Sequence, residues 1–182
     1  KFNDLIGRRD LIDFNGAEEH WKAHGLDLRK LIVSLEKEKD ETFYNSKEQN
    51  HRLELALDNE LISKSKKAIS DKIKVNISSK IVNTNRTVGG MLSGVIAKKY
   101  GHNGLPKDTI NVDFTGNAGQ SFGAWLSKGV NFNLKGDAND YVGKGLSGGR
   151  ISVSPHETSK IIPENNIIAG NTLLYGAISG EC

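Results

Sequence analysis

Glycine is distributed very unevenly along this 182-residue sequence. Residues 86–182 contain seventeen of the twenty glycines, and residues 1–85 contain three. In the glycine-rich part, short apolar runs centred on Val112, Val130 and Ile151 recur at steps of 18 and 21 residues. A unit of about 20 residues made of a short strand and tight turns cannot bury its apolar face alone. We therefore expect the units to stack as coils whose strands pair in parallel.

Glycines follow the apolar runs where such coils would turn. Glycine accepts the positive φ values and the close backbone approach that tight corners need. A sandwich of antiparallel hairpins fits less well, because two-residue hairpin signals such as Asn-Gly between paired strands are missing. The pattern predicts a mainly β fold, a β-solenoid over residues 81–182. The expected corner glycines are Gly116, Gly119, Gly123, Gly136, Gly143, Gly145, Gly148 and Gly149. The expected short strands lie at 110–114, 130–134, 151–153, 167–168 and 173–174.

Residues 1–80 have the pattern of a partly helical N-terminal segment that leads into the solenoid. Leu53, Leu57 and Leu61 recur every four residues, which predicts a helix at about 46–70. The other elements expected are short helices near 3–13 and 27–34, a polar surface connection over 36–50, a strand over 72–77, and a helix at about 88–100 that ends at Gly101.

The composition narrows the class of protein. Aliphatic residues recur throughout and the formal net charge is only +3, so we expect a folded chain without an electrostatic footprint for nucleic acid. No apolar run approaches the roughly 18 residues of a membrane span, and the first residues lack a secretory pattern. The single cysteine, Cys182, excludes an internal disulfide and a cysteine zinc cage. These features favour the cytoplasm.

One motif suggests nucleophilic chemistry. Residues 119–123 match the G-x-S-x-G pattern around Ser121, and Asp137, Asp140 and His156 follow in the order of an α/β-hydrolase triad. Such a nucleophile needs a strand before it and a substantial helix after it, and no alternating β/α pattern surrounds this one. A stand-alone serine hydrolase using Ser121 remains an alternative function.

A second motif suggests nucleotide binding. Residues 143–148 match G-x-G-x-x-G, whose mechanism is a turn that feeds the N-terminus of a helix holding a pyrophosphate. The next residues, 150–155, instead alternate like a strand and end in proline. A solenoid corner fits this context better, and a nucleotide-binding module using Gly143–Gly148 is the other alternative.

Histidine and tryptophan provide little further evidence of a site. His20 and His24 have the i, i+4 spacing of a helical metal pair, but no third ligand occurs at a suitable spacing. We therefore expect surface histidines and no metal site. Trp21 and Trp125 are expected to be core anchors rather than ligand platforms.

Several longer strings resemble one family. They lie at 5–8, 25–28, 83–89, 92–94, 100–101, 104–106, 108–110, 118–124 and 136–149. Together they are similar to the C-terminal region of the large subunit of glutamate synthase, including its GXGXG domain. The resemblance covers nearly the whole chain, and residues 36–50 are its least familiar part. A subunit of formylmethanofuran dehydrogenase has a similar domain, but the 83–94 string favours glutamate synthase.

The resemblance implies a right-handed parallel β-helix without bond-making chemistry. In that family one domain releases ammonia from glutamine, and a domain with FMN and an iron–sulfur cluster adds the ammonia to 2-oxoglutarate. The β-helix packs between them as a scaffold. The resemblance thus implies no catalytic, cofactor-binding or metal-binding residue in this segment, and it implies the amidotransferase and flavin domains as partners. The electron donor is left open.

The C-terminal end departs from the family pattern. The family continues with further glycine-rich coils after the equivalent of residues 179–181, whereas this sequence stops at Cys182. We expect the last coil, with the apolar residues of 173–178, to present an open edge. Self-association through residues 165–182 is the corresponding expectation, whether the chain is an excised fragment or a short natural protein.

Overall fold

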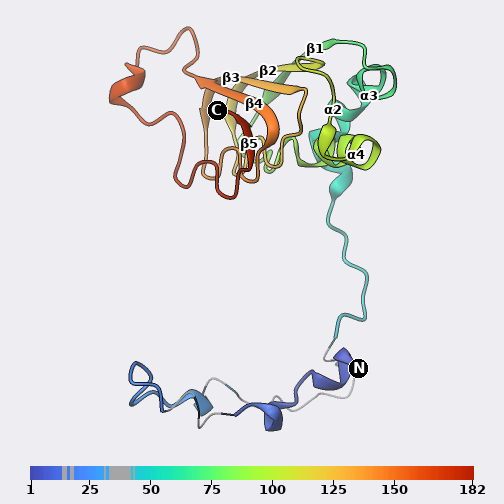
Figure 1. Ribbon diagram of the computed structural model, residues 1–182. Coiled ribbons are helices and arrows are strands. Elements are labelled where there is room, and N and C mark those ends of the chain that lie inside the picture. The colour runs from blue at the N-terminus through green and yellow to red at the C-terminus, as the bar shows by residue number, and fades with distance from the viewer. Residues whose placement is uncertain (14–15, 17–18, 31, 33–41, 43) are drawn as a thin grey trace. The chain divides into compact units, whose positions relative to one another are not determined.

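The computed structural model describes residues 1–13, 16, 19–30, 32, 42 and 44–182, which form two units, Lys1–His51 and Arg52–Cys182 (Figure 1). The first unit has the single-turn helices η1 (Phe2–Leu5), η2 (Arg9–Leu11) and η3 (Leu28–Lys30). The predicted helices near 3–13 and 27–34 are thus single turns where they are described. Part of the 36–50 connection, namely 36–41 and 43, lies outside the described residues. Trp21 is 74% exposed, so its prediction as a core anchor is wrong.

The second unit contains a parallel sheet whose strands follow chain order. The strands are β1 (Val75–Ile81), β2 (Ile110–Ala118), β3 (Val130–Ala138), β4 (Ser147–Ser154) and β5 (Ser179–Glu181). The predicted parallel pairing is confirmed. The register differs from the predicted alignment, because Val112 pairs with Phe132, and Phe132 with Ile151. Pairing Val112 with Val130 would have shifted this face of the sheet by two residues.

Two of the predicted strands do not form. Residues 167–168 and 173–174 belong instead to the long connection between β4 and β5, where Ala169 makes an isolated bridge to Ala138. Leu174 has a left-handed backbone with φ of 57°, which interrupts any strand there.

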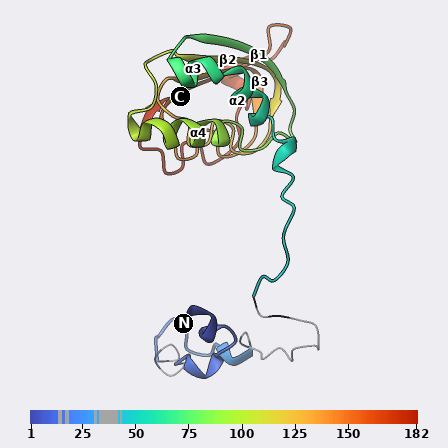
Figure 2. The same ribbon diagram turned by 90° about the vertical axis from the view of Figure 1, so that its right-hand side faces the viewer.

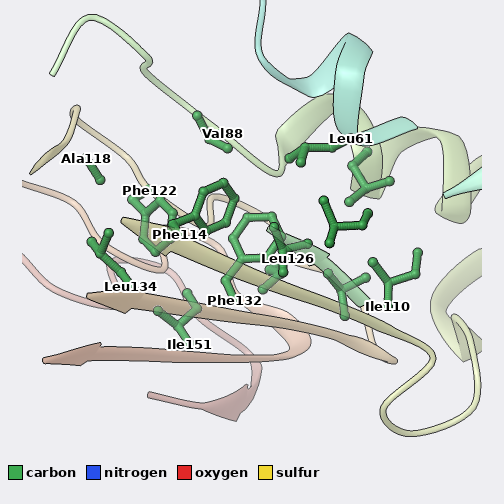
Figure 3. Close-up of a cluster of buried hydrophobic side chains, with 14 of the residues drawn as sticks. Leu61, Val88, Ile110, Phe114, Ala118, Phe122, Leu126, Phe132, Leu134 and Ile151 are labelled. Carbon is green, nitrogen blue, oxygen red and sulfur yellow. The ribbon is translucent and has the colours of Figure 1, made fainter. Parts of the chain in front are cut away.

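Alternate residues of the strands point into one apolar core (Figure 3). Phe114 of β2 meets Phe132 of β3 edge to face, with ring centroids 5.0 Å apart. Phe122, from the connection after β2, packs edge to face on Phe114 at 5.4 Å. The core therefore lies between the sheet and the connections that run back across it.

Three helices belong to this unit: α2 (Asp58–Lys64), α3 (Lys66–Asp71) and α4 (Gly90–Tyr100). Single turns η4 (Leu53–Leu55), η5 (Gly101–Asn103) and η6 (Pro163–Asn165) complete its elements. In Figure 2, α4 runs across the opposite side of the unit from the strands. Among the described residues, no helix is both long and apolar enough to cross a bilayer.

The helix predicted over 46–70 starts later and is interrupted. Arg52 has a left-handed backbone, and Leu53 remains 60% exposed, so the apolar stripe begins at Leu57 and Leu61. The helix also breaks at Ser65, where α2 ends and α3 begins. Residues 46–52 are polar and present no apolar face to the core, so no packing stabilises a helix there.

Asp58 links two of these helices. Its buried carboxylate accepts hydrogen bonds from the backbone N–H groups of Gly89 at 3.0 Å and Leu92 at 2.9 Å, at the N-terminus of α4. These donors have no partner inside the helix, so the carboxylate satisfies them. Burial raises the pKa of the Asp58 carboxyl above its ordinary value, although the backbone hydrogen bonds oppose that shift.

Candidate interaction surface

The corner segments, defined as residues 85–89, 119–126, 139–146 and 170–177, form a second hydrogen-bonded ladder. Their backbones are left-handed at alternate residues, with φ of 63° at Ser121, 70° at Gly123 and 53° at Trp125. The N–H groups of these left-handed residues do not all point to the same neighbouring segment. The N–H of Gly123 donates to the preceding segment at the Val88 carbonyl, whereas that of Trp125 donates to the following segment at the Lys144 carbonyl, at 2.8 and 2.7 Å.

The next corner segment repeats this geometry through the motif glycines. Tyr141, Gly143 and Gly145 have φ of 63°, 66° and 63°. The N–H of Gly143 donates to the Phe122 carbonyl at 2.9 Å, and that of Gly145 donates to the Tyr175 carbonyl at 2.8 Å. Backbone amides that a phosphate would need are therefore engaged in pairing. The strand β4, and not a helix, follows the motif.

The predicted corner glycines occupy tight positions of two kinds. Positive φ values occur at Gly116, Gly123, Gly136, Gly143, Gly145 and Gly148. Gly119 and Gly149 lie outside that region, but a Cβ at either would come within 3 Å of a backbone oxygen, that of Asn85 or Leu126. At these two positions a neighbouring backbone leaves no room for a side chain, although the backbone conformation would allow one.

The candidate triad around Ser121 is not joined by hydrogen bonds among the described residues. The Ser121 N–H donates to the backbone carbonyl of Asp140 at 2.8 Å, and the Asp140 carboxylate accepts from the N–H of Asn171 at 2.8 Å. A turn, rather than the helix of a nucleophile elbow, follows Ser121. These side chains support a corner and do not form a charge relay.

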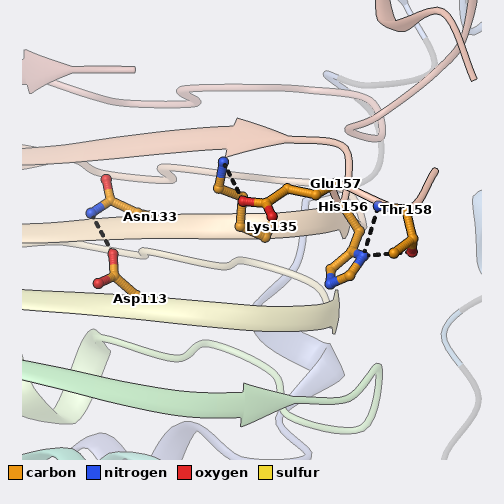
Figure 4. A network of polar contacts seen from close by, with 6 residues as sticks. All are labelled: Asp113, Asn133, Lys135, His156, Glu157 and Thr158. Carbon is orange, nitrogen blue, oxygen red and sulfur yellow. Dashed lines mark hydrogen bonds and ion pairs between the residues drawn. The ribbon is translucent and has the colours of Figure 1, made fainter.

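The remaining members of that motif lie on a different part of the unit. His156 follows β4, and its Nδ1 shares a hydrogen bond of 2.8 Å with the Thr158 hydroxyl (Figure 4). Asp137 lies at the end of β3, where its carboxylate accepts from the Asn117 side chain at 2.7 Å. Neither group orients the other toward Ser121, so the motif is not assembled as a general-base site.

Polar ladders cover the outer face of the sheet rather than converging on a ligand. Asn133 donates to the Asp113 carboxylate at 2.9 Å, and the Ser152 hydroxyl donates to Asn133 at 3.0 Å. Asn131 similarly donates to Asn111 and Asp108. Within the part of the chain that the structure describes, no three histidine, cysteine, aspartate or glutamate side chains are grouped to hold a metal.

An apolar groove of about 690 Å³ runs beside α4. One wall is the small-residue side of the helix, where Gly90, Gly94 and Ala97 expose its backbone surface. Gly94 has open space around the position of a Cβ. The opposite wall includes Trp125 and Ile178, which are 49% and 82% exposed. We define this feature as the α4 groove.

The prediction that Trp125 is a core anchor is wrong, like that for Trp21. It was expected in the core, but its ring lies over Gly145 at the surface, with Nε1 2.7 Å from where a Gly145 Cβ would lie. The groove lining includes His102 and Lys128 and no acidic side chain. Such a half-exposed aromatic in an apolar, mildly basic groove is typical of a surface that another polypeptide covers.

The spacing of Gly90 and Gly94 was the one available signal for this surface. Glycines four apart lie on the same side of a helix, and that side can take a close neighbour. The sequence alone did not indicate that Trp125 and Ile178 would face them, because those residues are distant along the chain.

Several known proteins contain a segment that is similar to this chain. The family model for the GXGXG motif matches residues 58–182. The chain is 45% identical over 182 residues to the glutamate synthase [NADPH] large chain of Bacillus subtilis, covering 99% of this chain and 12% of that one. It is 44% identical over 180 residues to the glutamate synthase [NADH] of Schizosaccharomyces pombe, covering 98% and 8%. It is 41% identical over 181 residues to ferredoxin-dependent glutamate synthase 2 of Synechocystis, covering 98% and 12%. The chain thus spans about a tenth of the length of these relatives.

Proposed function

This chain belongs to the GXGXG motif family, and we propose that it is the GXGXG segment of a glutamate synthase, with a structural and interaction role. The observation that supports this most directly is similarity over 98–99% of the chain to three relatives. Their names differ in the electron donor, which is NADPH, NADH or ferredoxin, while the identity stays between 41% and 45%. If this segment has the same role in all three relatives, that role does not depend on the electron donor.

We further propose that the second unit is a right-handed parallel β-helix. The strands pair in chain order, and the corner segments pair with one another on the opposite side of the core. Each turn of the chain is then hydrogen-bonded to its neighbours along two ladders. A segment of this kind is suited to act as a spacer, because its length grows by one coil at a time and its outer face is free for contacts.

The chemistry of the proposed parent enzyme belongs to other domains. We propose that an amidotransferase domain and a domain with FMN and an iron–sulfur cluster lie beside this segment, and that the enzyme is cytoplasmic. Two observations support a non-catalytic segment. The amides of Gly143 and Gly145 are used in pairing, and within the described part of the chain Ser121 has no hydrogen bond to a histidine.

The α4 groove is the surface that we propose for contact with a neighbouring domain. Its apolar walls and exposed Trp125 would otherwise remain in water, which is unfavourable by about 25 cal/mol per Å² of apolar area. The exposed apolar residues of the last corner segment, Leu173, Leu174 and Tyr175, provide a second contact area. We propose that this area supports self-association when no other partner covers it.

The test uses a longer polypeptide that contains this segment together with its flanking domains. We expect that polypeptide to make glutamate from glutamine and 2-oxoglutarate and to show flavin absorbance. Absence of both the activity and the flavin in a folded preparation would refute the assignment.

A pair of variants tests the groove itself. Gly94→Trp fills the α4 groove, and Val95→Trp places the same side chain on an exposed part of α4 outside the groove. We expect Gly94→Trp to reduce glutamate synthase activity at least tenfold in the longer polypeptide, and Val95→Trp to leave it within twofold. Both variants should keep the far-ultraviolet spectrum. Equal activities would show that no domain occupies the groove.

A further inference from the structure

If one coil is counted for each of β1 to β4, the fourth coil of the second unit is longer than the third. Ser121 and Tyr141 are equivalent corner residues, since each has a left-handed backbone and donates its N–H to the next corner segment. They are 20 positions apart. The equivalent residue after Tyr141 is Thr172, with φ of 58°, and it lies 31 positions further on. The fourth coil therefore holds 11 residues more than the third.

The additional residues leave the coil directly after β4. The chain rejoins the stack at Ile168, whose carbonyl accepts from the Ala138 N–H at 3.1 Å, and at Gly170, whose N–H donates to the Ala138 carbonyl at 3.0 Å. Residues 155–167 between these points form a loop that extends away from the sheet (Figure 1). A loop of this length, with one single-turn helix, is uncommon unless it has a function. Insertions into repeats also gather on faces used for binding.

The loop is held mainly by its own residues. Thr158 bonds to His156, and the Asn166 side chain donates to the Ile162 carbonyl at 2.8 Å. An ion pair of 3.9 Å between the exposed Lys135 and Glu157 connects the loop to β3 (Figure 4). A cleft of about 340 Å³ separates the loop from the ends of β2 and β3. The loop is thus shaped mainly by local hydrogen bonds, and it borders the sheet across this cleft, which Ile161 and Ile167 help to line.

Three isoleucines of this loop are exposed to water. Ile161, Ile162 and Ile167 are 44%, 53% and 87% exposed. Leaving such side chains on an extended loop is unfavourable unless a partner buries them, because the loop also loses conformational entropy when it is ordered. The loop carries two acidic residues, Glu157 and Glu164, and one basic residue, Lys160. This acidic excess disfavours an anionic membrane or a nucleic acid, which would select an excess of lysine and arginine.

We propose that the 155–167 loop is a docking arm that inserts its isoleucines into an apolar recess on another domain of the same glutamate synthase polypeptide. This inference rests on the proposed function. It is supported by the length of the relatives, in which about nine-tenths of the polypeptide lies outside the segment matched here. A neighbouring domain of the same polypeptide is present at a high effective concentration, so a small apolar contact suffices to hold it.

Photo-cross-linking in the longer polypeptide tests this arm. A benzophenone amino acid replaces Ile162 in one variant and Ile73 in a control, because both side chains are 53% exposed and Ile73 lies outside the loop. We expect position 162 to cross-link to peptides outside this 182-residue segment at least five times more efficiently than position 73. Cross-links from position 162 only to this segment or to water would overturn the proposal, and so would equal capture from both positions.

Glutamate synthase activity of the same preparations separates the two proposals. A preparation that makes glutamate but shows no capture at position 162 overturns the docking arm and leaves the proposed function intact. A folded preparation without the activity contradicts the proposed function, and the docking arm then fails with it. Deuterium exchange gives a second readout, because peptide 155–167 should exchange at least tenfold faster in an Ile162→Ser variant than in Ile73→Ser.

Discussion

At the scale of single residues, the fold depends on whether a glycine position has room for a side chain. Gly116 and Gly136 pair across β2 and β3 with φ of 130° and 153°, and a Cβ on Gly136 would overlap the carbonyl oxygen of Gly116. Gly94 is different, because its Cβ would meet nothing within 4 Å on the surface of α4. The packing of β2 against β3 therefore requires glycine at position 136. At position 94 the fold itself would accept a larger side chain.

Gly136→Ala should lower the free energy of unfolding by about 2 kcal/mol or more, since the new methyl group combines backbone strain with overlap. Urea unfolding followed by circular dichroism measures this change. Gly94→Ala is the matched control and should be neutral or stabilising by up to about 1 kcal/mol, because alanine favours the helix. A Gly136→Ala protein with an unchanged midpoint would contradict the close approach of β2 and β3.

Asp58→Ala should destabilise the second unit by about 1–3 kcal/mol, because it leaves the Gly89 and Leu92 N–H groups without their acceptor. Asp58→Asn keeps one oxygen acceptor and should cost less. Thermal unfolding of the two variants at neutral pH gives the comparison. If alanine and asparagine were equally tolerated, the capping role would be wrong.

The pH dependence of Asp58 has a definite sign. Its pKa is raised in the folded protein, so the folded state binds the proton more tightly than the unfolded state. The contribution of this group to stability is then greatest below the ordinary pKa and falls as pH rises through the raised value. The stability of the native chain relative to Asp58→Asn should decrease over that interval. An increase in that relative stability with rising pH would mean that the pKa of Asp58 is lowered, not raised, in the folded protein.

At the scale of the elements, helix ends and corners are joined by contacts that are distant in sequence. The carbonyl of Ile69, near the end of α3, accepts from the Tyr100 hydroxyl at 2.6 Å and from the Lys99 ammonium at 3.0 Å. Both donors come from the end of α4. The short helix α3 is thus stabilised by its neighbour, since six residues are too few to be stable alone.

Tyr100→Phe should reduce the stability of α3 by about 0.5–1.5 kcal/mol, the usual net value of one hydrogen bond. Native-state hydrogen exchange at the amides of α3 measures the loss locally. Tyr175→Phe is the control, because Tyr175 is 61% exposed and keeps its ring against Tyr141 after the change. The same exchange rates in both variants would show that the Tyr100 hydroxyl adds nothing.

At the scale of the whole molecule, the second unit is built by addition along the chain. Each strand pairs with the next one in sequence, and each corner segment pairs with its neighbours. The apolar interior is continuous from Leu61 beside α4 to Ile151 of β4. A change in one coil should therefore affect the coils beside it first.

The 182-residue chain alone should be colourless and should neither hydrolyse glutamine nor form glutamate. It should also remain unlabelled by a fluorophosphonate probe, because no histidine activates Ser121. Absorbance spectroscopy, a coupled glutamate assay and gel fluorescence measure these outcomes. Labelling that disappears in Ser121→Ala would restore the hydrolase alternative.

Sequence reasoning succeeded where a property depends on residues close in the chain. Parallel pairing followed from repeated strands of similar length, and α4 ended at Gly101 as expected. The motif at 143–148 leads into a strand and not into a helix, as the alternation of residues 150–155 predicts. Helix boundaries were less successful, since the start of α2 depends on whether Leu53 finds a neighbour to pack against.

The sequence by itself determined that short strands would stack in parallel with glycine at tight positions, because strand alternation and glycine conformation are local properties. Only the tertiary structure decided which residues meet across coils. Three contacts show this, and each joins residues at least 20 positions apart. Val112 pairs with Phe132, Asp58 caps α4 at Leu92, and the ring of Trp125 lies over Gly145. Such contacts are selected by how well the whole core packs, and no window of the sequence contains both partners.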